Sequence, residues 1–320
     1  MHAGSGLVTV FIPKCGYQTV QTAFPEAMVV TDKNEAYVSD IKFDINPSVI
    51  AIGPGMGKHA ETVDAFYQFL LQNEKPLVVD ADALNIISEN KKLLPYIKGR
   101  AVLTPHPKEL ERLIGSWKDD FDKLEKTKLF SKENDVVLLI KGAYTATVYH
   151  DKVFFNSTGN PGMATGGSGD VLTGIIAGLI AQGYSLFNAA FVGVYIHGRA
   201  GDLAVLRSGV EALTATDIID FTGDAFLDLL KKNKKDYQEK IKDLKDLPKL
   251  IEKTLLLDNG LLSLKVVEVA KDYLKAEVAI GGPLGQRRHV NLPGVYVRLP
   301  SITEKDKVDT KVAVEAGVDF

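Results

Sequence analysis

Short apolar runs alternate with stretches of helical character from the N-terminus to about residue 220. Runs of β-branched and other apolar residues, bounded by Gly, Pro or polar residues, predict buried strands at residues 6–12, 27–31, 49–52, 77–79, 100–104 and 136–140. Helices are predicted over residues 60–72, from near Leu84, and after Glu109. This alternation is typical of an α/β fold built on a mostly parallel sheet.

Two further patterns complete this part of the chain. Thr147–Tyr149 and Val153–Phe155 predict a hairpin around His150 and Asp151. Residues 171–197 lack acidic and basic side chains up to His197, but glycines and polar residues interrupt the apolar character. We therefore expect two packed core helices joined at residues 183–185 and no membrane span.

Polar residues and glycines follow successive predicted strands. They are Gly55 and Gly57, then Asp80 and Asp82, then His106, and then Lys141. The carboxyl ends of parallel strands share one edge of a sheet, so we expect these groups along a single crevice. Each has a second interpretation. The glycines approach a ligand or form a plain strand-to-helix turn, and the two aspartates orient a metal-bound phosphate or cap a helix. His106 donates to a substrate or is structural, and Lys141 meets a phosphate or lies on the surface.

The stretch from Asn160 to Asp170 is rich in glycine and opens onto an apolar helical run. Gly166–Gly169 are predicted to form an anion cradle, in which backbone N–H groups and a helix N-terminus face a phosphate. Asp170 beside it can accept a proton from a hydroxyl group, which points to phosphoryl chemistry. Capping of the helix is the alternative role of Asp170. The spacing is neither that of a P-loop nor that of a dinucleotide fingerprint.

Composition narrows the class of protein. With 45% apolar and 25% charged residues the chain can bury a substantial core, and a net charge of −3 gives no general attraction to nucleic acid or anionic lipid. The single Cys15 excludes an intramolecular disulfide. No charged-then-apolar leader is visible at the start, so the cytoplasm is the expected location.

Several motifs in order resemble the ADP- or ATP-dependent NAD(P)H-hydrate dehydratases, which have a ribokinase-like fold with a three-layer, mostly parallel α/β sheet. The matching stretches are residues 53–57, 79–85, 103–109, 141–145 and 160–170, within a region covering roughly residues 3–225. The resemblance implies that the protein repairs NADH or NADPH hydrated at C6 of the nicotinamide ring. We take residues 1–230 as this domain.

The resemblance also implies roles for individual residues. Asp170 would be the catalytic base, and the substrate-binding residues would be Gly55, Gly57, His106 and Asp170. The nucleotide, ADP or ATP, would be bound by Lys141, Gly142, Ala143, Tyr144, Thr145, Gly166, Gly167, Ser168 and Gly169. No protein metal site is expected, because Mg²⁺ would arrive on the nucleotide phosphates.

The chain departs from that family at both ends. The strand, glycine-rich loop and helix with which the family normally begins are expected to be absent before Ala3. Residues 231–253 predict a charged linker rich in Lys, and residues 254–320 resemble a fragment of the pyruvate kinase lid domain, a small antiparallel β-barrel. Strands are predicted at residues 261–269 and 273–279. Arg287 and Arg288 are expected to be solvated surface residues, the alternative from the resemblance being a contact with a nucleotide phosphate. The parts of pyruvate kinase that hold metal and substrate are missing, so pyruvate kinase activity is not expected.

Two other functions remain open from the sequence. A ribokinase-like small-molecule kinase would use the same cradle and base, and a truncated, chimeric chain would bind nucleotide without turnover. A homo-oligomer is expected from the analogy of fold alone.

Overall fold

The computed structural model describes residues 1–230 and, for the backbone alone, residues 254–257, 262–269, 274–280 and 290–291. The chain divides into two compact units, Met1–Leu229 and Leu230–Phe320. The predicted linker at residues 231–253 and the predicted surface arginines Arg287 and Arg288 lie outside the described residues.

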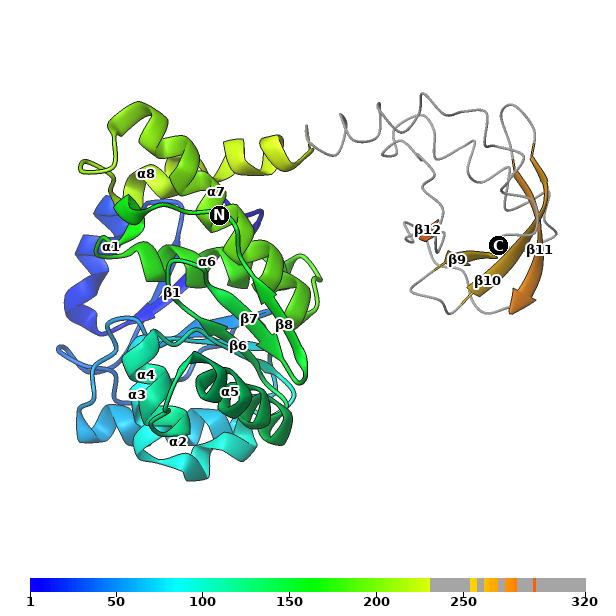
Figure 1. Cartoon of the computed structure of the whole chain (residues 1–320). Coiled ribbons are helices and arrows are strands. Elements are labelled where there is room, and N and C mark those ends of the chain that lie inside the picture. Colours follow the sequence, from blue (N-terminus) through cyan, green and yellow to red (C-terminus); the bar gives the residue numbers. More distant parts are fainter. Residues whose placement is uncertain (231–253, 258–261, 270–273, 281–289, 292–320) are drawn as a thin grey trace. The chain divides into compact units, whose positions relative to one another are not determined.

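A six-stranded sheet forms the centre of the first unit (Figure 1). Its strands, in spatial order, are β3 (Ile50–Ile52), β4 (Leu77–Val79), β5 (Ala101–Leu103), β6 (Val137–Ile140), β7 (Ala146–Tyr149) and β8 (Lys152–Phe155). Strands β3 to β6 are parallel, whereas β7 and β8 are antiparallel and form the predicted hairpin. The prediction of a mostly parallel sheet is confirmed.

Helices cover both faces of this sheet, giving three layers (Figure 1). One face carries α2 (Ala60–Gln72), α3 (Ala81–Glu89), α4 (Pro107–Ile114) and α5 (Asp120–Asn134), and the other carries α6 (Ser168–Ala181) and α7 (Leu186–Ser208). Successive side chains of a strand point to opposite faces. Leu77 and Val79 accordingly pack in the core beneath α2–α5, and Val78 packs beneath α6 and α7.

The uncharged run of the sequence forms α6 and α7, as predicted, with the chain turning at residues 183–185. Short elements fill the connections: η2 (Lys91–Tyr96), η3 (Pro161–Met163) and α8 (Ala215–Asp220), followed by helical residues 222–230. Among the helices described, we find none with the length and apolar character needed to cross a membrane.

The two N-terminal strands differ from expectation. β1 (Thr9–Ile12) and β2 (Met28–Thr31) pair with each other in a separate two-stranded parallel sheet, connected through η1 (Lys14–Gly16) and α1 (Tyr17–Ala23). Their residues are half-buried, or exposed in the case of Met28. The prediction that these strands are buried was therefore wrong, because a pair of strands outside the main sheet is not covered on both faces. It was also wrong for β3, whose residues are half-buried or, at Ala51, exposed, because β3 is an edge strand of the main sheet.

The second unit contains an antiparallel sheet in the order β11-β10-β9-β12. The strands are β9 (Thr254–Leu257), β10 (Leu262–Val269), β11 (Leu274–Ile280) and β12 (Val290–Asn291). Strands β10 and β11 agree with the two that the alternating pattern predicted.

Candidate active site

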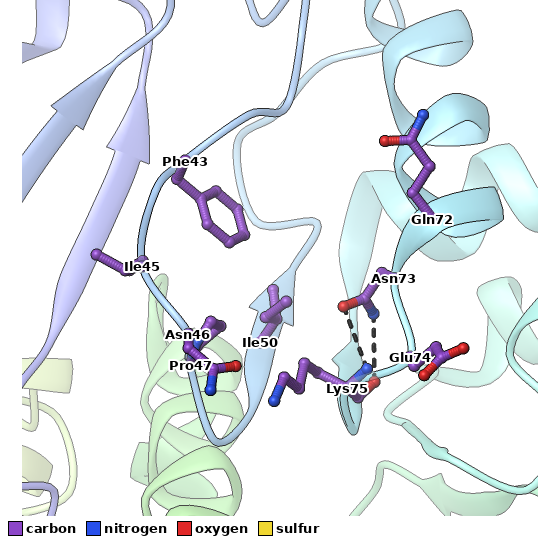
Figure 2. Close-up of a pocket in the computed structure, with 9 residues that line it drawn as sticks. All are labelled: Phe43, Ile45, Asn46, Pro47, Ile50, Gln72, Asn73, Glu74 and Lys75. Atoms are coloured by element: carbon purple, nitrogen blue, oxygen red, sulfur yellow. Dashed lines mark hydrogen bonds between the residues drawn. The ribbon is translucent and has the colours of Figure 1, made fainter.

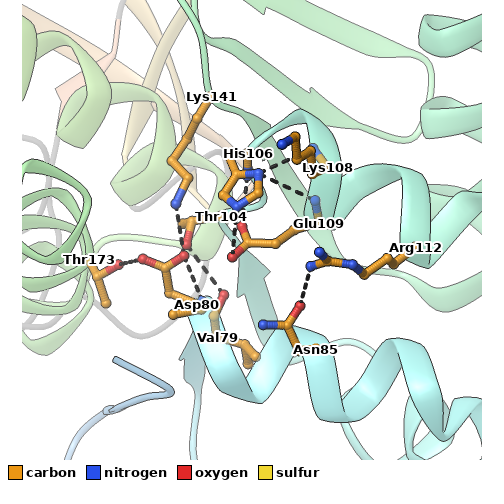
Figure 3. Close-up of polar contacts among 11 residues, drawn as sticks. Val79, Asp80, Asn85, Thr104, His106, Lys108, Glu109, Arg112, Lys141 and Thr173 are labelled. Carbon is orange, nitrogen blue, oxygen red and sulfur yellow. Dashed lines mark hydrogen bonds and ion pairs between the residues drawn. The ribbon is translucent and has the colours of Figure 1, made fainter. Parts of the chain in front are cut away.

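The candidate site lies at the carboxyl ends of the parallel strands. Asp80 follows β4, the loop from Thr104 to His106 follows β5, and Lys141 follows β6. Figure 3 shows that Lys141, from above, and Thr173, from the left, both point toward Asp80. The strand order therefore places these predicted groups together, as expected for an open α/β sheet.

Asp80 is the buried centre of this group. Its side chain is 2% exposed, and its Oδ1 accepts hydrogen bonds from the Lys141 Nζ and the Ala81 amide, both at 2.9 Å. Its Oδ2 accepts from the Thr173 Oγ1 at 2.9 Å. A buried carboxylate needs such partners to remain ionised. Asp80 thus both caps helix α3 and holds the ammonium group of Lys141 in place.

The loop after β3 packs closely against this centre. Gly53 has a φ of +129°, and a Cβ at this position would lie 1.8 Å from the Asp80 carbonyl oxygen, so glycine is required here. The Gly57 amide donates to the Asp82 Oδ2 at 2.9 Å. A Cβ added at Gly55 or Gly57 would meet nothing within 4 Å, so this loop presents open backbone.

The anion cradle forms at the start of α6. Gly167, with a φ of +84°, is the N-cap residue and makes no side-chain cap. The Ser168 amide donates to the Thr165 carbonyl at 3.4 Å, which leaves the amides of Gly169 and Asp170 as the first-turn donors for a ligand. Ser168 and Gly169 belong to the first turn of the helix itself. A Cβ at Gly169 would lie 3.5 Å from the Lys141 Nζ, which places the cradle beside that ammonium group.

Asp170 also stands in the first turn of α6, and its residue surface is exposed overall. Partial burial of its carboxyl group raises its pKa, and so does the negative charge of Asp80, while Lys141 opposes the shift. A carboxylate with a raised pKa is a stronger proton acceptor. The predicted base therefore has an environment suited to that role.

His106 has the structural role that was the second of its two interpretations. Its Nδ1 accepts from the amides of Lys108 at 3.1 Å and Glu109 at 3.4 Å, and the Glu109 side chain accepts from the His106 amide (Figure 3). His106 is thus the N-cap of α4 in a capping box. Its Nε2 lies 3.4 Å from the Glu109 Oε1, and its side chain is half-exposed at the site edge.

The remaining predicted nucleotide residues form an open turn after β6. Gly142 and Thr145 are linked through the Thr145 Oγ1, which accepts from the Gly142 amide or donates to the Gly142 carbonyl. Gly142, Ala143 and Tyr144 are exposed, Tyr144 at 74% of its surface. The turn begins at Lys141 and therefore adjoins the cradle.

Two polar residues near the site do not follow a strand, so the pattern of strand ends does not predict them. Thr173 is three residues after Asp170 on α6, a spacing that places both on one helix face and could have identified it. His197 on α7 lies with its Nε2 3.3 Å from the Ser168 Oγ.

A cavity of about 290 Å³ lies away from this site (Figure 2). Its lining includes Ile50, the first residue of β3, and residues 72–75 at the end of α2. It is thus at the amino end of the strand, whereas the carboxylates and the cradle are at the carboxyl ends. We assign the chemistry to the latter.

Comparisons with known proteins agree with this geometry. The family model described as NAD(P)H-hydrate dehydratase matches residues 1–222, and that described as the pyruvate kinase barrel domain matches residues 207–320. A bifunctional NAD(P)H-hydrate repair enzyme of Moorella thermoacetica is 42% identical over 233 residues, covering 69% of this chain and 44% of the relative. An ADP-dependent (S)-NAD(P)H-hydrate dehydratase of Neisseria meningitidis is 36% identical over 60% of this chain and 65% of the relative.

Solved structures agree as well. The ADP/ATP-dependent NAD(P)H-hydrate dehydratase of Bacillus subtilis, co-crystallised with ATP and Mg²⁺, matches with a TM-score of 0.59 and 25% identity, over 71% of this chain and 80% of that chain. The chain spans about half the length of the curated repair enzymes that it matches, 44% in the case of the Moorella protein.

Proposed function

The chain belongs to the NAD(P)H-hydrate dehydratase family, and we propose on that premise that its first unit dehydrates hydrated NADH or NADPH at the expense of ADP or ATP. The observation that carries the proposal is the position of Asp170. Its carboxyl group has a raised pKa at the start of an uncapped, glycine-rich helix, beside the ion pair of Lys141 and Asp80.

Each residue of this group has a role in the reaction. Asp170 accepts the proton of the C6 hydroxyl group as that oxygen bonds to phosphorus. The cradle amides and the Lys141 ammonium stabilise the charge on the phosphoryl oxygens. The nucleotide would supply the phosphoryl group: its terminal phosphoanhydride bond breaks, AMP leaves from ADP or ADP from ATP, and the hydroxyl oxygen becomes part of a phosphate, which is a good leaving group and departs as inorganic phosphate. The C6–O bond then breaks with assistance from the ring nitrogen lone pair, and the neighbouring ring carbon loses a proton, which restores the dihydronicotinamide.

The side chains of the site indicate how Mg²⁺ would be held. Among the residues described, no three His, Cys, Asp or Glu side chains are grouped so as to hold a metal ion, and both oxygens of Asp80 already accept hydrogen bonds. The cradle with Asp170 fits an ion carried by a nucleotide, which would be held mainly by the phosphates and would neutralise their charge.

The substrate side is proposed from the open loop after β3. A Cβ added at Gly55 or Gly57 would meet nothing within 4 Å, so the backbone there is open to a ligand. The half-exposed His106 follows β5, which is separated from β3 by the single strand β4. These features support contact with the hydrated nicotinamide. The family resemblance supports the cytoplasm as the location and a homo-oligomer as the assembly, and both remain predictions.

The second unit is proposed to be a β-domain without pyruvate kinase activity. Its described strands are all antiparallel, whereas an alternating β/α barrel has parallel strands. This supports the assignment of residues 254–320 to a lid-like fragment.

The reaction is tested with purified hydrated NADH or NADPH, Mg²⁺ and either ADP or ATP, by following the near-ultraviolet absorbance of the reduced nicotinamide. We expect nucleotide-dependent recovery of absorbance, and a loss of about 100-fold or more in kcat for Asp170→Asn, which removes the base. A folded protein that binds nucleotide but restores no absorbance would contradict the proposal. Accumulation of a phosphorylated small molecule would instead indicate a ribokinase-like kinase.

A further inference from the structure

The segment that leads into the cradle, residues 156–168, lies along helix α7. The Thr158 Oγ1 donates to the Tyr195 carbonyl at 2.9 Å. Two glycines of α7 allow this approach: a Cβ at Gly198 would lie 2.3 Å from the Thr158 Oγ1, and a Cβ at Gly201 would lie 2.4 Å from the Met163 Sδ. The positions on α7 are three or four residues apart, so one face of the helix supports the segment.

Asp202 lies on the same face and binds the middle of the segment. Its Oδ2 accepts from the Gly159 amide and its Oδ1 from the Asn160 Nδ2, each at 3.0 Å. The Asn160 Oδ1 in turn accepts from the Gly162 amide at 3.1 Å and caps the short helix η3. One carboxylate on α7 therefore sets the conformation of the chain just before the cradle.

His197 contacts the far end of the same segment. Its Nε2 lies 3.3 Å from the Oγ of Ser168, the first residue of α6, whose side chain is buried. Burial lowers the pKa of His197 to about 4, so the imidazole is neutral near pH 7 and adds no charge beneath the cradle. The hydrogen bond fixes the first turn of α6 relative to α7.

We propose that Asp202 and His197 are positioning residues for the nucleotide, which they do not touch: they hold residues 159–168 against α7 and so fix the cradle amides in the geometry that a phosphate requires. The inference rests on the proposed function, because it assigns nucleotide binding to the cradle. The relevant physical effect is preorganisation, since a loop already held in its bound conformation loses less entropy on binding.

The test compares Asp202→Asn with the wild-type full chain. The amide retains the shape of the side chain but leaves one of the two donors on Gly159 and Asn160 without an acceptor. We expect the dissociation constants of Mg-ADP and Mg-ATP to rise about tenfold, as for the loss of one charge-assisted hydrogen bond. The KM for hydrated NADH should stay unchanged, and amide hydrogen exchange in residues 159–169 should accelerate while the remainder of α7 keeps its protection.

Two further variants serve as an independent test and as a control. Gly198→Ala should weaken nucleotide binding in the same direction, because its Cβ displaces Thr158 from the helix. Asp228→Asn is the matched control: it removes a carboxylate that accepts from the Arg199 Nε of α7 at 2.7 Å, outside the 156–168 segment, and should leave nucleotide affinity unchanged.

The results separate the two proposals. Asp202→Asn with wild-type nucleotide affinity, or with unchanged exchange in residues 159–169, would overturn the positioning role. A folded wild-type protein that binds neither nucleotide contradicts the proposed function instead, and the exchange measurement then still decides whether Asp202 holds the segment.

Discussion

Asp80 and Lys141 act on the carboxyl group of Asp170 in opposite directions, since the negative charge of Asp80 raises its pKa and the positive charge of Lys141 lowers it. A general base must be deprotonated, so activity falls as the pH drops through the pKa of Asp170. The acid limb of the pH profile of kcat/KM should therefore lie above the ordinary aspartate value of about 3.9. Asp80→Asn should move that limb to lower pH, and Lys141→Met should move it to higher pH.

The measurement is kcat/KM for hydrated NADH as a function of pH, with Asp151→Asn as a control carboxylate, since Asp151 is exposed and outside the site. Loss of activity without opposite movements of the acid limb would contradict electrostatic control of Asp170. Thermal unfolding provides a second readout. Lys141→Met leaves Asp80, 2% exposed, without its cation, and should destabilise the fold by up to about 3 kcal/mol, the cost of breaking a buried pair.

At the scale of elements, a second polar cluster joins the end of α5 to the hairpin of β7 and β8. The Asp135 Oδ1 accepts from the Tyr149 hydroxyl at 3.0 Å and lies 2.8 Å from the His150 Nε2. The hydrogen bond with His150 lowers the pKa of Asp135, as does the one with Tyr149. A carboxyl group whose pKa is lower in the folded than in the unfolded state stabilises the fold at pH values above its unfolded-state pKa. This stabilisation is lost as the pH falls through the folded-state pKa.

Asp135→Asn should accordingly lower the Tm near neutral pH by a few degrees. The cluster is partly exposed, so its loss should reduce the free energy of unfolding by about 1 kcal/mol or less. The difference from the wild type should shrink as the pH falls below about 3.9, where the unfolded-state carboxyl group becomes protonated, and should vanish below the lowered folded-state pKa of Asp135. Thermal unfolding at a series of pH values measures this. A constant difference in Tm at all pH values would show that the side-chain packing, and not the charge, stabilises the hairpin.

The sequence predicted the elements of the main sheet because buried parallel strands are continuous apolar runs. It predicted the location of the site because Asp80, Lys141 and the cradle each follow or begin such an element. It did not predict their contacts. The ion pair joins residues 61 apart and depends on the strand order, which places β4 and β6 on either side of β5.

Helix starts were harder to predict, because they depend on backbone conformation. Helix α3 was expected to begin near Leu84 but begins at Ala81, whose φ of +48° is unusual for alanine and follows the Asp80 cap. For His106 the sequence left open a substrate contact or a structural role, and the structure shows that the structural role is that of a helix cap through Nδ1. Histidine is not among the favoured capping residues, so no propensity indicates this role.

At the scale of the whole molecule, every residue to which we assign a role in the reaction lies within the unit Met1–Leu229. The three layers that position these residues belong to the same unit, and so do all described side chains of the two core clusters. The dehydratase family model ends at residue 222, within the same unit. We therefore propose that the reaction does not require residues 231–320.

A chain ending at residue 230 should then keep a kcat/KM for hydrated NADH within about twofold of the full chain, because compact units with their own core fold independently. Its thermal unfolding should remain cooperative, and Asp170→Asn in the shortened chain should abolish turnover as it does in the full chain. The comparison is made at equal concentrations of folded protein, checked by circular dichroism. A shortened chain that is folded and binds nucleotide, but has lost about tenfold or more in kcat/KM, would show that the second unit contributes to catalysis and would refute its assignment as a separate β-domain.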